Sequence, residues 1–267
     1  AVHNAYVLAV AGGIVLTVLG ILLTPHMLTW MNTPEATMGD AVLYLRIYFG
    51  ALTFTFIYNM GASILRAAGN SHTPLYYLIV CCFLNIVLDL FTVVVLNMGI
   101  AGAAIATVIS QAVSAALVTR SLMKSYDLLK LRLRAIRIHP DLLRAEFRIG
   151  LPGGLQSCAY SISNIIIQAA INNFGTDTAA AWAAFGKMDA IFWTISGSFG
   201  ITIATFAGQN FGARRFDRIQ KSVRVCLAMA LGLSCVLLIF LFVCCRPLYY
   251  AFTTDPSVID IGVYMLR

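Results

Sequence analysis

The sequence contains few charged residues, 11% of its 267 positions, where an ordinary soluble domain has roughly 25%. Histidine is also scarce, with four residues. Hydrophobic residues make up 60% of the chain, and the mean hydropathy is +0.86. So few charges could not keep a surface of this size in water. The composition therefore excludes soluble enzymes, nucleic-acid-binding proteins and disulfide-rich scaffolds.

The cysteines give no sign of a metal site or of a disulfide framework. All of them lie inside apolar runs, where cysteine behaves as a small hydrophobic residue, and none has the spacing to histidine that a zinc site needs. They are Cys81, Cys82, Cys158, Cys226, Cys235, Cys244 and Cys245. We expect no cofactor and no structural metal.

Long apolar runs occur instead of the alternating or 3.6-residue patterns of soluble domains. Runs of about 18 or more apolar residues indicate membrane-spanning helices. The sequence predicts seven complete spans at 5–23, 41–65, 75–96, 100–119, 149–171, 178–207 and 225–245, with another beginning near 257. The predicted fold class is an all-α polytopic membrane protein.

The basic residues predict its orientation. Fourteen of the eighteen Lys and Arg residues lie in the loops 66–73, 120–148 and 209–224 or at their edges. The opposite loops carry mainly acids, namely Glu35, Asp40, Asp177 and Asp255, with Arg246 as their one basic residue. The positive-inside rule places the basic loops in the cytoplasm. We expect a multi-pass protein of the plasma (inner) membrane.

One long basic connection separates two groups of spans. Residues 1–123 form the predicted amino-terminal lobe, 124–148 the linker, and 149–267 the first part of a carboxy-terminal lobe. The amphipathic pattern around Pro140 is typical of a helix lying along the cytoplasmic membrane surface. A solvated linker between two lobes explains the same residues.

An internal repeat supports two related lobes. PHMLTWMNTP at 25–34 resembles PLYYAFTTDP at 247–256, with Pro25 matching Pro247 and Pro34 matching Pro256 at an offset of 222 residues. Each copy follows an apolar run, although few identities support the match. The first span then corresponds to the seventh, so one repeat holds six helices. This count predicts two six-helix lobes related by a pseudo-two-fold axis along the membrane normal, and a chain truncated at both ends.

Asp89 is the most informative polar residue within the predicted spans. An ionisable group at membrane depth is costly, which makes a functional role the leading hypothesis. Asn85 lies four residues earlier on the same helix face, and Thr107 follows a short hairpin at the same depth, ~12 Å from the outer ends. Carboxylate, amide and hydroxyl oxygens suit Na⁺ or a proton. A buried Asp that merely bonds two helices is the alternative.

The later spans carry weaker signals. Lys187 and Asp189 are two residues apart, which points them to different helix faces. They line a polar pocket of the second lobe or, alternatively, pair with helices outside this sequence. The fifth span contributes Gln156 and Asn164 but no acid. We treat these four residues as possible substrate contacts.

Four ordered stretches resemble the multidrug and toxic compound extrusion (MATE) family of antiporters. They are LRAAGNSHTPLYYLIVCCFLNIVLD at 65–89, GIAGAAIATVISQ at 99–111, GLPGGLQS at 150–157 and FAGQNFGARRFDR at 206–218. The resemblance covers essentially the whole chain. It implies that the spans correspond to helices three to nine of a twelve-helix family, with the tenth beginning at the end.

The resemblance also implies a coupling-cation site. Asn85, Asp89 and Thr107 match the family's Asn, Asp and Thr on helices five and six, and Ala103 matches a contributor of a backbone carbonyl. One branch of the family uses an acid on helix seven, which has no counterpart in this sequence. That difference favours coupling at Asp89.

These inferences predict a monomeric, non-enzymatic transporter that exports small organic compounds of cationic or amphipathic character in exchange for Na⁺ or H⁺. A lipid-linked oligosaccharide flippase of related fold is one alternative, although it needs a cavity rich in cations and the spans supply only Lys187. A seven-helix receptor or retinal protein, with Lys187 as the Schiff-base lysine, is another alternative. The internal repeat argues against the receptor.

Overall fold

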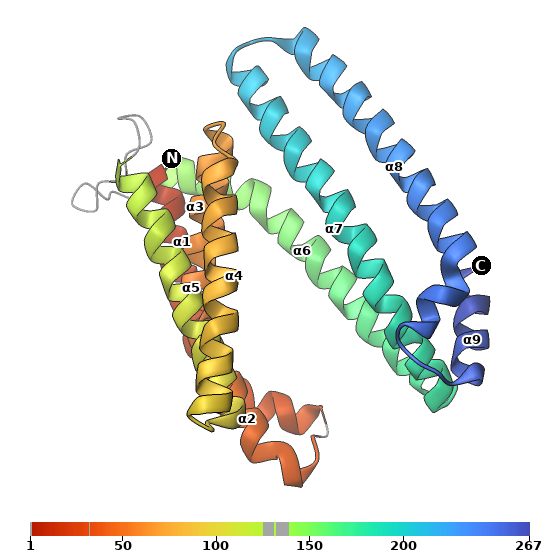
Figure 1. The fold of residues 1–267 in the computed structure, drawn as a ribbon. Coiled ribbons are helices and arrows are strands. Elements are labelled where there is room, and N and C mark those ends of the chain that lie inside the picture. Colours follow the sequence, from red (N-terminus) through yellow and green to blue (C-terminus); the bar gives the residue numbers. More distant parts are fainter. Residues whose placement is uncertain (1, 32, 125–130, 132–138) are drawn as a thin grey trace. The chain divides into compact units, whose positions relative to one another are not determined.

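The protein is all-helical throughout the part that the structure, a computed structural model, describes: residues 2–31, 33–124, 131 and 139–267. No strand occurs within these ranges (Figure 1). In hydrocarbon every backbone N–H and C=O group needs an internal partner, which a helix provides within one segment. The predicted fold class is confirmed. The chain divides into two compact units, Ala1–Arg148 and Ile149–Arg267.

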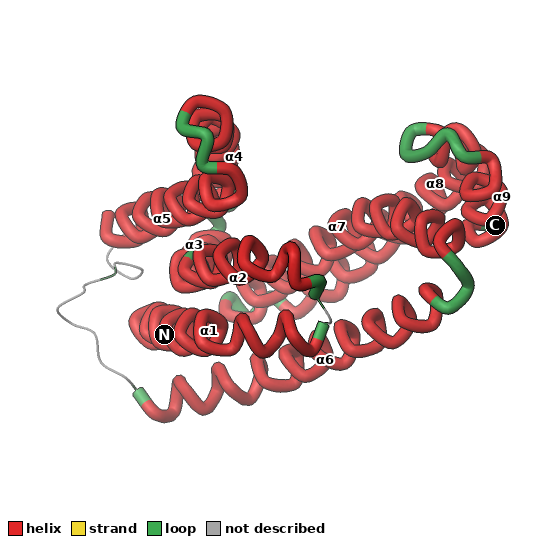
Figure 2. Tube along the Cα trace, turned by 90° about the horizontal axis from the view of Figure 1, so that it is seen from below, coloured by secondary structure: helices red, strands yellow, loops and turns green. Residues whose placement is uncertain are grey.

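The first unit is a bundle of long helices. Its elements are α1 (Val2–Trp30), α2 (Glu35–Gly50), α3 (Leu52–Ala67), α4 (His72–Leu90), the short π-helix η1 (Phe91–Val95) and α5 (Gly99–Lys124). Helix α3 packs against both α1 and α5, and α4 packs on the other side of α5. Figure 2 shows this row of helices nearly end-on. A core around Tyr6, Leu65, Val118 and Leu122 holds one end together.

Helix α1 approaches α3 through small residues. A Cβ added to Gly13 would lie 2.8 Å from the Cα of Thr53, so only glycine fits this contact. One turn further, the Thr17 hydroxyl lies 3.0 Å from the Thr53 hydroxyl and donates to the Phe49 carbonyl over 3.1 Å. Gly20 then lies against the Phe49 ring. The backbones therefore come close enough for hydrogen bonds between helices, a common arrangement in membranes.

Asn4 ties the segment before α6 to α1. Its Nδ2 donates to the His139 carbonyl over 2.8 Å, and its Oδ1 accepts from the His139 backbone N–H over 2.9 Å. The side chain is 2% exposed. The amide thus pairs with both backbone groups of one residue 135 positions away along the chain.

We expect Asn4→Ala to lower the free energy of unfolding by about 2 kcal/mol, because the His139 donor and acceptor lose their partners. The measurement is thermal unfolding of the purified protein in detergent. Asn173→Ala, which truncates an exposed amide beyond the end of α6, is the matched control and should leave the transition in place. An equal transition temperature for Asn4→Ala and wild type would contradict the role of this pairing.

The second unit consists of α6 (Pro140–Asn172, which begins before the unit boundary), α7 (Thr176–Gly212), α8 (Phe216–Tyr250) and α9 (Pro256–Leu266). Helix α9 packs against both α7 and α8. Tyr249 is fully buried there among Ala184, Met188 and Ile259. Its ring lies against Gly262, where a Cβ would overlap it. The phenol donates to the Ala181 carbonyl over 3.4 Å.

Asp255 caps α9. Its carboxylate accepts a hydrogen bond from the backbone N–H of Ser257 over 2.9 Å and another from the Ser257 hydroxyl over 2.7 Å. The same hydroxyl lies 3.1 Å from the Asp177 carboxylate at the start of α7. The hydrogen bonds from the Ser257 side chain and backbone hold the pKa of the Asp255 carboxyl below its ordinary value. The cap is therefore weakened as the pH falls through that lowered pKa.

The described residues contain six helices that are long and apolar enough to cross a membrane, one fewer than the seven predicted. The missing one is α6, which has the necessary length of 33 residues. Its polar residues, including Gln156 and Asn164, lower its mean hydropathy, and its first turns are charged. Helix α2 and helix α3 together form a single span, interrupted at Ala51.

The predicted loops are mostly too long. Helix α1 continues to Trp30 where a loop was expected from residue 24, and α8 already begins at Phe216 and continues to Tyr250. Hydropathy marks only the part of a helix that lies in hydrocarbon, whereas the backbone hydrogen bonds continue into the polar interface. The predicted surface helix falls largely on residues 125–130 and 132–138, which lie outside the described residues. From Pro140 onward the linker is part of α6.

The two copies of the sequence repeat have the same local structure. Pro25 lies inside α1 near its end, and Pro247 lies inside α8 near its end. In each copy a short turn follows and the second proline begins another helix: Pro34 is the N-cap of α2, and Pro256 is the first residue of α9. The matching sequence of helix, turn and helix supports the repeat.

Candidate functional site: a polar cavity in the first unit

A cavity of about 240 Å³ lies between α3, α4 and α5. Its polar side chains come from all three helices. Helix α3 contributes Thr55, Tyr58 and Asn59, helix α4 contributes Asn85, and helix α5 contributes Thr107, Ser110, Gln111 and Ser114. Polar groups spaced three or four residues apart share one helix face, which explains how α3 and α5 each turn a polar stripe inward.

The serine and threonine hydroxyl groups of the cavity donate to their own helices, whereas the Tyr58 hydroxyl donates to the Pro74 carbonyl of α4 over 2.9 Å. Thr107 donates to the Ala103 carbonyl over 3.0 Å, Ser110 to the Ala106 carbonyl over 2.8 Å, and Thr55 to the Ala51 carbonyl over 3.1 Å. Since each hydroxyl carries one proton, its remaining lone pairs can only accept. The lining is therefore rich in acceptors, which suits a cation or a proton donor.

Two buried polar atoms beside this cavity have no hydrogen-bond partner within the described part of the chain. They are Nδ2 of Asn85 and Oδ1 of Asp89, one helical turn apart on α4. A buried unpartnered acceptor costs free energy, and a charged one costs most. Turning the Asn85 amide about its last torsion would exchange Nδ2 for Oδ1. The pair could then present two oxygens to Na⁺ or to a proton on Asp89.

A π-helical segment begins two residues after Asp89. In η1 the N–H of Leu96 bonds to the Phe91 carbonyl over 3.0 Å, and the Thr92 hydroxyl donates to the Leu88 carbonyl over 2.8 Å. Such wide turns are rare and occur frequently at functional sites. No pattern in the sequence predicted this segment.

The structure brings together part of the predicted set. Asn85 and Thr107 line one cavity, and the Ala103 carbonyl is bonded to Thr107. Asp89 is half-buried and does not line the cavity itself; it lies one turn beyond Asn85. The contribution of α3 was missed, although the spacing of Thr55 and Asn59 was a usable signal. Nor does any group of three or more His, Cys, Asp or Glu residues suited to a metal occur where the chain is described.

The candidate residues of the second unit do not form a comparable site. Lys187, Gln156 and Asn164 are exposed, and Asp189 is half-buried. Within the described ranges none of the four makes a hydrogen bond or an ion pair. Lys187 and Asp189 form no ion pair with each other in the described structure, which agrees with their two-residue spacing. Their role as substrate contacts stays a prediction.

The fold and the polar cavity define a polytopic α-helical membrane protein with a polar site inside its bundle. The sequence model of the MatE family matches residues 1–91 and 152–267. The chain belongs to this family, and the predicted family resemblance is confirmed. It is an integral protein of the plasma membrane.

Curated relatives and solved structures agree with this assignment. The chain is 31% identical over 263 residues to the probable multidrug resistance protein YoeA of Bacillus subtilis, a match that covers 95% of this chain and 56% of YoeA. It is 28% identical to the probable multidrug resistance protein YpnP of the same organism, covering 99% of this chain and 59% of YpnP. The crystal structure of MATE in the bent conformation matches with a TM-score of 0.89 at 20% identity, over 98% of this chain and 58% of that one. The chain therefore spans somewhat more than half the length of these relatives.

Proposed function

We propose that this chain is part of a secondary active transporter that exports small organic compounds in exchange for Na⁺ or H⁺. The observation that supports this proposal is the buried carboxylate oxygen of Asp89, which has no donor among the described residues and lies one turn along α4 from Asn85 in the acceptor-rich cavity. A cation bound at this oxygen would offset the cost of burying it without a partner. Family membership and the names of the relatives support transport as the activity.

Coupling requires that ion binding favour one conformation of the transporter over another. Na⁺ or H⁺ at Asp89, with Asn85 and Thr107 supplying further oxygens, would bring in one positive charge. Each entering charge draws about 2.3 kcal/mol from a membrane potential of 100 mV. We propose that the exported compounds are cationic or amphipathic, that Lys187, Asp189, Gln156 and Asn164 contact them, and that the transporter acts as a monomer.

The flippase alternative requires a cavity lined with cations. The described cavity between α3, α4 and α5 is lined by neutral side chains, which favours export of organic compounds over export of anionic lipid-linked sugars. Membership of the MatE family removes the reason to consider a receptor or a retinal protein.

The test is export by the complete protein in vesicles with an imposed ion gradient. A fluorescent organic cation is loaded inside, and an inward Na⁺ gradient and an inward H⁺ gradient are applied in separate experiments. We expect one of the two to accelerate efflux. Vesicles without the protein are the control. If neither gradient raises the efflux rate above that of the control vesicles, the proposed antiport is wrong.

A further inference from the structure

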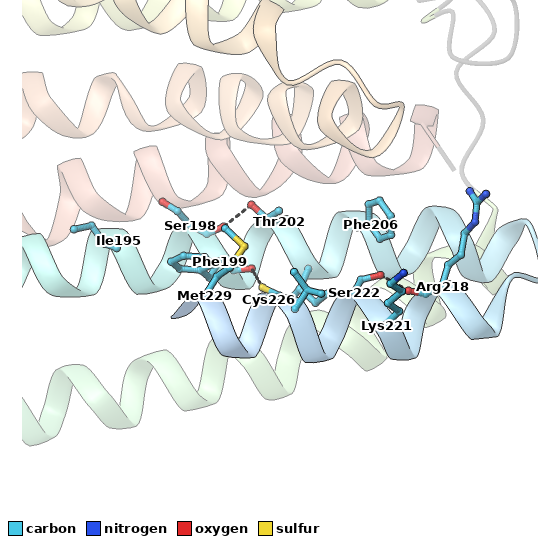
Figure 3. A pocket seen from close by; sticks show the side chains of 12 residues that line it. Ile195, Ser198, Phe199, Thr202, Phe206, Arg218, Lys221, Ser222, Cys226 and Met229 are labelled. Carbon is cyan, nitrogen blue, oxygen red and sulfur yellow. Dashed lines mark hydrogen bonds between the residues drawn. The ribbon is translucent and has the colours of Figure 1, made fainter. Parts of the chain in front are cut away.

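A long apolar groove runs between α7 and α8, with a volume of about 700 Å³ (Figure 3). Ile195, Phe199 and Ile203 line it from α7, and Val225 and Met229 line it from α8. The lining extends over twelve residues of each helix, from Ile195 to Phe206 and from Arg218 to Met229, and the end residues are ~16 Å apart along the helix axes.

The polar side chains inside the groove are already satisfied by backbone groups. Ser198 donates to the Thr194 carbonyl and Thr202 to the Ser198 carbonyl, each over 2.8 Å. Ser222 donates in the same way to the Arg218 carbonyl, and the Cys226 thiol donates to the Phe199 carbonyl over 3.8 Å. An occupant of the groove therefore meets carbon along most of its length.

Two cationic side chains lie at one end of the groove. Arg218 and Lys221 lie in the first two turns of α8, at the end that also carries Phe206, and Figure 3 shows them on the same side of the close-up. Neither has an ion-pair partner among the residues that the structure describes, and Asp217 beside Arg218 does not line the groove. The positive-inside rule puts this end at the cytoplasmic surface.

We propose that this groove binds an anionic phospholipid of the cytoplasmic leaflet, with its phosphate between Arg218 and Lys221 and an acyl chain along Phe199 and Met229. The charge of the two side chains is complementary to a phosphate, and basic pockets between helices on the cytoplasmic side of membranes bind anionic head groups. The length of the apolar part of the groove favours a lipid over a free anion. Inorganic phosphate would leave this carbon-lined part exposed, whereas an acyl chain would cover it. The inference is independent of transport.

The experiment uses the complete protein in phosphatidylcholine vesicles that contain a small fraction of photoactivatable phosphatidylglycerol. Cross-linked residues are identified by mass spectrometry, and photoactivatable phosphatidylcholine at the same fraction gives the head-group control. We expect phosphatidylglycerol to label the groove preferentially. Each basic residue near the surface changes the affinity about fivefold, so Arg218→Gln with Lys221→Gln should reduce this labelling ~30-fold.

Arg224→Gln is the matched control, because Arg224 lies on α8 but does not line the groove. It should leave the labelling unchanged. Val225→Trp, which fills the apolar part without altering a charge, should reduce labelling by both lipids.

Three outcomes would overturn the proposal. Equal labelling by the two lipids would mean that Arg218 and Lys221 select no head group. Absence of labelling by either lipid would mean that protein, either another part of the chain or a second copy, covers the groove. Displacement of phosphatidylglycerol by inorganic phosphate alone would identify a free-anion site.

Discussion

Asp89→Asn is expected to abolish ion-driven export while leaving the protein as stable as the wild type, or more stable. The amide has nearly the same shape as the carboxylate but carries no charge and takes up no proton. Coupling free energies between two binding sites are typically 1–3 kcal/mol, which corresponds to ~5–150-fold. We expect gradient-driven efflux from vesicles to fall to the level of vesicles without protein.

The stability measurement separates the two readings of Asp89. If this side chain only bonded two helices, its replacement would lower the unfolding temperature. Its Oδ1 is instead buried with no hydrogen-bond partner in the part of the chain that the structure describes, and removal of an unpaired buried charge relieves a cost. Activity lost at an unchanged or higher unfolding temperature therefore supports a cation site, as is common where function opposes stability. Normal gradient-driven export by Asp89→Asn would refute it.

Two further variants sharpen this test. Asp40→Asn changes a carboxylate on the exposed part of α2, away from the polar cavity, and should export normally. Thr107→Ser keeps the hydroxyl that bonds to the Ala103 carbonyl, whereas Thr107→Val removes it. Export that survives in Thr107→Ser and weakens in Thr107→Val would indicate that the hydroxyl oxygen, and not the shape of the residue, matters.

Gly13→Val is expected to cause the second large effect, a loss of stability of about 1–3 kcal/mol from overpacking. A Cβ at this position meets the Cα of Thr53 at 2.8 Å, and backbone cannot turn aside as a flexible side chain can. Helix α1 must then move away from α3, which also lengthens the hydrogen bond between Thr17 and Thr53. Thermal unfolding in detergent measures the change.

The neighbouring glycine provides a matched control. A Cβ on Gly12 has no atom within 4 Å beyond its own helix, so Gly12→Val adds the same side chain without the clash. Both variants share the helix propensity of valine, and their difference therefore isolates the contact with Thr53. Equal unfolding temperatures for the two would show that α1 and α3 are not held as closely as described.

The sequence was informative wherever chemistry is local. Apolar runs marked all the long helices, α6 included, although α6 is too polar to count among the six membrane-spanning candidates of the described residues. The four-residue spacing of Asn85 and Asp89 placed both on one face of α4. The match between Pro25 and Pro247 located two equivalent helix ends. The first two depend on residues a few positions apart or on their preference for the membrane, and the third depends on a repeated sequence pattern. All three are visible in the sequence without knowledge of the fold.

Features that depend on three-dimensional contact were not predictable. Gly12 and Gly13 are the same residue type at neighbouring positions, yet only Gly13 lies against the backbone of another helix. The third wall of the cavity comes from Thr55 and Asn59, which no charge singles out in the sequence. Likewise, Asn4 and His139 are 135 positions apart, so their pairing follows from packing and not from local pattern.

The hydroxyl groups along α7 allow this helix face to move against a neighbour without breaking hydrogen bonds. Thr194, Ser198 and Thr202 lie four residues apart, and each donates its proton to the carbonyl one turn earlier on the same helix. No neighbour has to supply or receive those bonds. A helix or lipid in contact with this face can slide along it or be exchanged without breaking a hydrogen bond, so such a movement carries little enthalpic barrier from this stripe.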